Sequence, residues 1–154
     1  MSETPGTRDR LVGAMRDALQ RRGLHGVGLN EIVATAQAPK GVLYHHFPGG
    51  KTALAVAAIE STVATIEGAL DALLARHPDP LDALDAWVAS AARTLATSDY
   101  ERGCPLATVA LETGADDTAL RSALTAAFDR MRVRLAQALR SAGHGDERAD
   151  ALAA

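Results

Sequence analysis

The sequence contains few aromatic residues and a single cysteine. Phe, Trp and Tyr make up 3% of the 154 residues, whereas apolar residues make up 47% and charged residues 23%. Apolar content supplied by alanine and leucine is typical of packed helices and disfavours an aromatic-rich β-sandwich, so we expect an all-α fold. Cys104 stands alone, which excludes an intrachain disulfide and a zinc site built from cysteines, because both need partners.

Long apolar runs are also lacking. No uninterrupted run approaches the roughly 18 residues that a membrane-spanning helix needs. The first ten residues have no apolar core of the kind found in a signal peptide. We therefore expect a cytoplasmic protein with no membrane partner.

The charge is low overall and unevenly distributed. The net charge is −3, which taken alone disfavours a nucleic-acid partner. Residues 1–55, however, carry seven Lys or Arg against four acids, whereas residues 56–154 carry nine against fifteen. A basic first third joined to an acidic remainder is typical of a small DNA-reading module attached to a domain with another task.

Apolar spacing and helix-end signals predict a series of helices and no strands. Thr7 is expected to cap the first helix and Gly23 to end it, Pro39 to be the first helical residue of the third, and Asp79 to cap the fifth with Pro80 in its first turn. The expected helices cover residues 8–22, 29–36, 39–46, 51–76, 80–97, 105–113, 118–142 and 146–154.

The second and third of these helices are short, are separated by a tight turn and lie in the basic part of the chain, which is the pattern of a helix-turn-helix. Residues 38–51, Ala-Pro-Lys-Gly-Val-Leu-Tyr-His-His-Phe-Pro-Gly-Gly-Lys, resemble the signature of the TetR family of transcriptional regulators. The stretches at residues 28–32 and 103–106, Gly-Leu-Asn-Glu-Ile and Gly-Cys-Pro-Leu, look like the LmrA/YxaF-like branch of that family.

The resemblance implies a domain organisation. Residues 1–50 would form a three-helix DNA-binding head, and a long fourth helix would join it to a helical effector-binding and dimerisation domain at residues 51–154. It also implies a homodimer that binds a palindromic operator and releases it when a small molecule binds. Family members usually continue through two further long helices, so we expect the second domain to be incomplete beyond Ala154.

The resemblance implies that Lys40, Tyr44, His45 and Lys51 contact DNA, and their chemistry suits phosphate oxygens. Base readout would then fall to Gln37, Lys40 and Val42, because an amide pairs with adenine and a valine touches the thymine methyl, while Gly41 lets the backbone approach. The structural alternative is that Tyr44 only packs and that the lysines are ordinary surface residues.

A small-molecule site is expected among the later helices. The candidate lining residues are Trp87, Leu106, Val109, Phe128 and Met131, and the candidate orienting groups are Arg93, Thr108 and Glu112. The scarcity of aromatic side chains and of buried charge favours a mostly apolar effector. The alternative for each lining residue is a plain role in the core, because amphipathic faces must pack whether or not a ligand exists.

Catalytic and cofactor-binding patterns fail on inspection. The Gly50-Lys51-Thr52 stretch imitates the end of a phosphate-binding loop, but that loop would need glycine where the chain has His45. His45 and His46 are adjacent and point about 100° apart on a helix, so they cannot share one metal ion. We expect neither an enzyme nor a cofactor. The other open alternative is a helical adaptor that keeps the fold without sequence-specific DNA binding.

Overall fold

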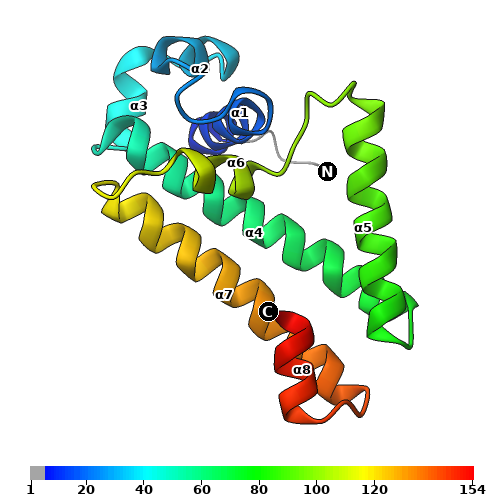
Figure 1. Ribbon diagram of the computed structural model, residues 1–154. Helices are drawn as coiled ribbons and strands as arrows, with labels where there is room; N and C mark the ends of the chain where they lie inside the picture. Colours follow the sequence, from blue (N-terminus) through cyan, green and yellow to red (C-terminus); the bar gives the residue numbers. More distant parts are fainter. Residues whose placement is uncertain (1–5) are drawn as a thin grey trace. The chain divides into compact units, whose positions relative to one another are not determined.

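The computed structural model describes residues 6–154, which form eight helices and no strand (Figure 1). The helices are α1 (Thr7–Arg22), α2 (Leu29–Thr35), α3 (Lys40–His46), α4 (Gly50–Arg76), α5 (Pro80–Thr97), α6 (Pro105–Glu112), α7 (Thr118–Ser141) and α8 (Asp146–Ala153). The all-α prediction is confirmed, because the local apolar period is sufficient to specify each helix.

The helix ends test the predicted caps. The Asp79 carboxylate accepts a hydrogen bond from the Leu81 N–H at 2.9 Å, and Pro80 is the first residue of α5, as predicted. Two predicted helix starts are wrong, the cap at Thr7 and the first helical residue at Pro39. Gly6 is the N-cap of α1, so Thr7 is already helical. Pro39 is the N-cap of α3, because its ψ of 139° is extended and its carbonyl accepts from Val42 N–H at 3.0 Å.

The chain divides into two compact units. The first contains residues up to Thr62 together with Glu101–Leu124, and the second contains Val63–Tyr100 and Thr125–Ala154. Helices α4 and α7 each contribute residues to both units. This division describes packing, and the functional boundary at residue 50 stays a prediction.

The first unit is built around α1, which contacts α2, α3 and α6. Its core consists of apolar side chains with almost no exposed surface, namely Leu11, Met15, Leu19, Ile32, Leu43, Leu54, Leu106 and Val109. A fully buried side chain of this size contributes about 1.5–3 kcal/mol. The two short helices α2 and α3 are therefore held by α1, since helices of seven residues are too short to be stable alone.

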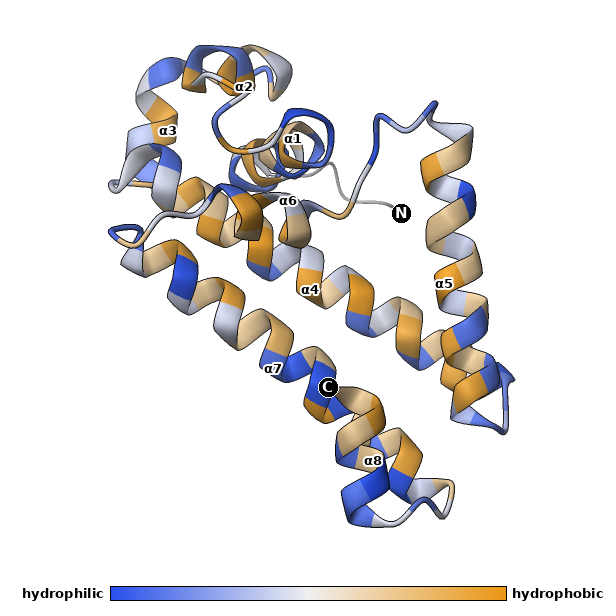
Figure 2. Cartoon of the chain, viewed as in Figure 1, coloured by the Kyte–Doolittle hydropathy of each residue, from blue (hydrophilic) through white to orange (hydrophobic). Residues whose placement is uncertain are grey.

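By length and composition, α4 is apolar enough to cross a membrane, a test that the core helix of a soluble domain also passes. Figure 2 shows hydrophobic residues along this helix. Its residues Leu54, Ala55, Ala58 and Ile59 are buried by the protein itself. The first half of α4 therefore packs in the core of the first unit.

In the second unit, arginines of α7 pair with acids of other helices. Arg134 donates to Asp71 of α4 at 2.7 Å, Arg130 binds Glu67 of α4, and Arg140 donates to Asp146 of α8 at 3.0 Å. Figure 2 shows hydrophilic and hydrophobic positions interleaved along α7. The unit also leaves large apolar side chains exposed, namely Val88, Phe128, Val133 and Leu152.

Candidate nucleic-acid interface

The turn between α2 and α3 is closed by backbone hydrogen bonds. The N–H of Ala38 donates to the Val33 carbonyl at 3.0 Å, and the N–H of Gln37 donates to the Ala34 carbonyl at 3.0 Å. This pair of bonds is a Schellman motif, which requires the residue at the position of Gln37 to be left-handed. Gln37 accordingly has φ of +50°, and its side chain is exposed.

Arg10 of α1 stabilises the same turn. Its Nε donates to the carbonyl of Ala36, the C-cap of α2, at 3.0 Å. A carbonyl at a helix C-terminus has no partner within the helix, so this bond satisfies an otherwise orphaned acceptor. The turn that carries Gln37 is thus held by α1 as well as by α2.

Helix α3 has one buried and one exposed side. Leu43 and the residue that follows the helix, Phe47, are buried in the first unit. The exposed side carries Lys40, Gly41, Tyr44 and His45, because these positions are one and four residues apart and so share a helix face. Val42, a predicted base-reading residue, is half-buried.

Gly41 is not required by the packing of the protein. A Cβ added at this position would meet no atom of the described residues within 4 Å, apart from its chain neighbours and the backbone of its own helix. Glycine in a helix costs about 1 kcal/mol relative to alanine, so the fold alone would favour a larger residue. A small residue on the exposed face of α3 leaves room for something outside the chain to approach the backbone.

Tyr44 lies beside the beginning of α4, where Lys51 is the second residue. A Cβ added at Gly50, the first residue of α4, would be 3.7 Å from Cε1 of Tyr44. Tyr44 nevertheless keeps 59% of its surface exposed. Tyr44 therefore both lies against the start of α4 and exposes more than half of its surface, so packing and phosphate contact are compatible for this residue.

The cations of the first unit fall into two groups, those that pair with carboxylates of the protein and those that remain available to a ligand. Arg21 pairs with Asp17 at 3.3 Å and with Glu101 at 2.8 Å. Arg22 pairs with Glu31, and this hydrogen bond raises the pKa of the Arg22 guanidinium above its ordinary value. Lys40 and Lys51 form no ion pair with any residue of the described chain.

A further cation of the first unit, which no sequence motif marks, resembles these two lysines. Arg8 forms no ion pair within residues 6–154, and its guanidinium carbon lies 5.4 Å from the centroid of the Phe47 ring. No local pattern connects Arg8 with Phe47, because the two residues lie far apart in the chain and meet only through the packing of α1 against the end of α3.

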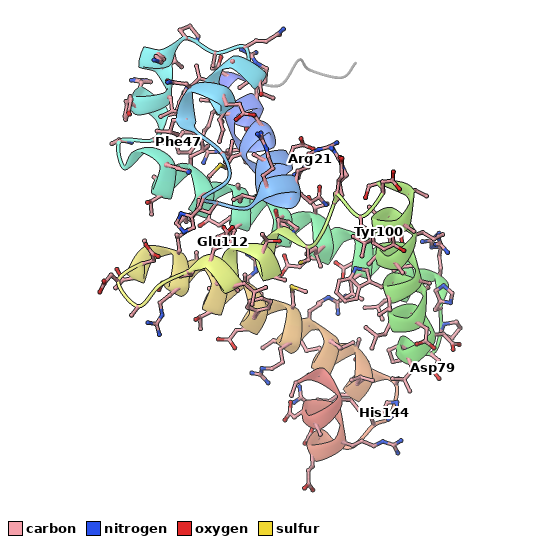
Figure 3. The ribbon with its side chains drawn as sticks, turned by 45° about the horizontal axis from the view of Figure 1, so that its top comes forward. Arg21, Phe47, Asp79, Tyr100, Glu112 and His144 are labelled. Atoms are coloured by element: carbon pink, nitrogen blue, oxygen red, sulfur yellow. The ribbon has the colours of Figure 1, made fainter. Side chains whose placement is uncertain are left out.

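Helix α6 is fastened to the end of α1 by polar contacts. The Glu112 carboxylate accepts from the Leu24 N–H at 2.5 Å, and the N–H of Gly103 donates to the Gln20 carbonyl at 3.2 Å. Figure 3 shows Glu112 on α6 and Arg21 at the end of α1. Glu112 therefore has a structural role in the first unit, whereas the sequence suggested it as an orienting group for an effector.

The second unit contains a cavity of about 280 Å³. Three predicted lining residues, Trp87, Phe128 and Met131, lie on it, together with charged residues that include Asp129 and Arg132. The complete lining is Ile66, Glu67, Leu70, Leu84, Trp87, Phe128, Asp129, Met131, Arg132, Arg134, Leu135, Ala153 and Ala154. The mixture of an apolar wall with a few charged groups is typical of small-molecule sites.

The other two predicted lining residues lie elsewhere. Leu106 and Val109 are on α6 in the first unit, where both are fully buried in its core. The candidate orienting residues Arg93 and Thr108 are likewise not among those that line the cavity. Periodicity identified apolar faces correctly, but it could not show which faces meet in one unit.

Comparisons with known proteins agree with this architecture. Residues 11–58 match the family model described as bacterial regulatory proteins, tetR family, and residues 80–154 match the model of the transcriptional regulator LmrA/YxaF-like C-terminal domain. The first match covers the part of the chain that contains α2, the turn, α3 and the beginning of α4.

Individual relatives cover most of the chain. The uncharacterized HTH-type transcriptional regulator YxaF of Bacillus subtilis is 29% identical over 99% of this chain and 80% of its own length. An uncharacterized HTH-type transcriptional regulator of Mycobacterium tuberculosis is 30% identical over 96% of this chain and 77% of its own. The crystal structure of regulatory protein TetR from Rhodobacter sphaeroides superposes with a TM-score of 0.81 at 30% identity, over 96% of this chain and 80% of that one. The chain therefore belongs to the TetR family of bacterial DNA-binding transcriptional regulators, in its LmrA/YxaF-like branch.

Proposed function

We propose that this protein is a dimeric repressor that binds a palindromic operator through α3 and the turn before it, and that a small, mostly apolar molecule releases it. The observation that carries the proposal is the exposed face of α3. This face carries Lys40 and the exposed side chains of Tyr44 and His45, and Lys51 lies at the beginning of the next helix, α4. Neither lysine forms an ion pair in the described chain.

The proposed roles follow from the chemistry of each side chain. Lys40 and Lys51 neutralise phosphates, and Tyr44 and His45 donate hydrogen bonds to phosphate oxygens. Gln37, at the left-handed turn, reads a base edge with its amide, and Val42 contacts a thymine methyl where its half-exposed side chain reaches the groove. Gly41 provides the close approach. The site of action is the cytoplasm, where the operator lies.

The test is the salt dependence of DNA binding by a Lys40→Ala, Lys51→Ala variant. An operator is first obtained by selecting bound fragments from a random duplex library, in which an inverted repeat is the expected result for a dimer. The double variant should lower the slope of log affinity against log salt by roughly two for each bound head. An Arg76→Ala, Arg93→Ala variant removes two exposed positive charges from the second unit and should keep the slope. An unchanged slope in the lysine variant would contradict the proposed phosphate contacts.

We place the effector in the cavity of the second unit. Its apolar wall, including Trp87, Phe128 and Met131, suits an apolar molecule, and bound effector favours the arrangement of the two heads that does not fit the operator. Met131→Trp should fill the cavity and abolish release by an apolar compound that frees DNA from the parent protein. Leu111→Trp, at a residue that is 90% exposed in the first unit, is the matched control.

The exposed apolar residues of the second unit support the proposed dimer. Val88, Phe128, Val133 and Leu152 each expose more than two fifths of their surface. Contact with a second copy would remove this surface from water. Sedimentation equilibrium tests the proposal, because a monomer at micromolar concentration that also recovers only half-sites from the library would contradict a dimeric repressor.

A further inference from the structure

Arg8 is a positive charge that the packing of the protein holds in place and does not neutralise. It lies in the first turn of α1 and is exposed. Other arginines of α1 are engaged by protein groups. Arg10 bonds to the Ala36 carbonyl, Arg16 to Ser61, Arg21 to Asp17 and Glu101, and Arg22 to Glu31. Arg8 pairs with no carboxylate among residues 6–154, including its exposed neighbour Asp9.

The contact that orients Arg8 is the ring of Phe47. The guanidinium carbon is 5.4 Å from the ring centroid, which is within the range of a cation–π interaction. Phe47 is itself fixed, because its side chain is buried and its N–H donates to the Leu43 carbonyl at 2.7 Å. A guanidinium that lies over an aromatic ring keeps its N–H groups at the edge of its plane, where they remain available to an outside acceptor.

Phe47 connects Arg8 to the proposed DNA-contact segment. It is the C-cap of α3 and directly follows the helix that carries Tyr44 and His45, and α4 with Lys51 begins three residues later, at Gly50. Figure 3 labels Phe47 at this junction between α3 and α4. The stacking therefore places a third cation beside this segment, and neither it nor the two lysines of the segment pair with a carboxylate in the described part of the chain.

We propose that Arg8 binds a backbone phosphate of the operator and that Phe47 is the residue that positions its guanidinium. This inference rests on the proposed DNA-binding function and adds a contact from α1. The chemistry fits a phosphate because the planar fork of an arginine donates two parallel hydrogen bonds to such an oxyanion. A phosphate contact carries no base information, so Arg8 raises affinity for all sequences alike.

The test compares Arg8→Gln with Arg22→Gln, which removes an equal charge from the same helix at a guanidinium already paired with Glu31. Affinity for the selected operator is measured from 50 to 200 mM KCl. Arg8→Gln should lower the slope by about 0.9 for each bound head, so that the loss of affinity over this range shrinks by about 3.5-fold per head. Arg22→Gln should keep the slope. Equal slope changes in both variants would overturn the inference, since net charge alone would then explain them.

A double-mutant cycle tests the role of Phe47. Phe47→Leu retains an apolar core residue without the ring, and it should lower the salt slope in the parent protein but not in the Arg8→Gln background. Equal effects in both backgrounds would overturn the positioning role. An unchanged slope in Arg8→Gln, while the Lys40→Ala, Lys51→Ala variant loses slope, would overturn the inference alone. Unchanged slopes in both would overturn the proposed DNA contacts themselves.

Discussion

We predict that Gln37 lowers the free energy of unfolding of the protein and that its side chain contributes to discrimination between operator sequences. It occupies the left-handed position of the Schellman motif with φ of +50°, and its side chain is exposed. A left-handed conformation costs a non-glycine residue about 1–2 kcal/mol. Glycine loses about 0.4–1 kcal/mol more through its freedom in the unfolded chain. Gln37→Gly should therefore raise the free energy of unfolding by about 1 kcal/mol, which is a rise of about 2–4 °C in Tm for a chain of this size.

The same substitution should weaken discrimination between operators. An amide that pairs with an adenine edge contributes about 1–3 kcal/mol of discrimination against the wrong base. Gln37→Gly removes that amide and should bring the affinities for the selected operator and for a variant at the contacted base pair together by roughly fivefold or more, as measured by competition binding. Non-specific affinity should change little, because no phosphate contact is lost.

Gln37→Ala separates the two effects. Alanine retains the cost of the left-handed conformation but lacks the amide, so this variant should lose discrimination while its free energy of unfolding stays within about 0.5 kcal/mol of the parent. Urea denaturation and competition binding on the three proteins provide both readouts. The reasoning is refuted if Gln37→Ala stabilises the protein as much as Gln37→Gly, or if both variants discriminate as well as the parent.

Three further predictions concern stability and are checked by urea denaturation. Gly23→Ala should lower the free energy of unfolding by about 2–5 kcal/mol, because φ at this position is +71° and the new Cβ would lie 2.1 Å from Oε1 of Glu112. The Glu112 carboxylate would have to move and would no longer accept from the Leu24 N–H. A loss below about 1 kcal/mol would contradict this prediction. Asp79→Ala should cost about 1 kcal/mol by removing the N-cap of α5, labelled in Figure 3, whereas Asp79→Asn should retain most of it. The Arg134 and Asp71 pair is partly exposed to solvent, so a double-mutant cycle to alanine should give a coupling below about 1 kcal/mol, and a larger value would contradict its solvent screening.

Several features of the protein follow from short-range information. The order of the helices was predictable because each has a local apolar period, and the Asp79 and Pro80 cap was predictable because it involves adjacent residues. Thr7 and Pro39 were misplaced by a single residue, since neighbouring positions at a helix start satisfy similar local preferences. The motif at residues 38–51 indicated the family, because its residue types fit the end of one turn, the short helix α3 and the start of α4.

Other features depended on the path of the chain. The sequence alone could not separate the cations of the first unit, because Arg21 pairs with Glu101, a residue 80 positions away, whereas Lys40 and Lys51 form no ion pair within residues 6–154. Nor could it place Leu106 and Val109 in a core apart from Trp87, Phe128 and Met131. Amino-acid order determined the helices and the recognition motif, because helical spacing acts within a few residues. Only the tertiary structure decided which charges stay unneutralised and which apolar faces enclose a cavity, because ion pairing and burial depend on residues that folding brings together.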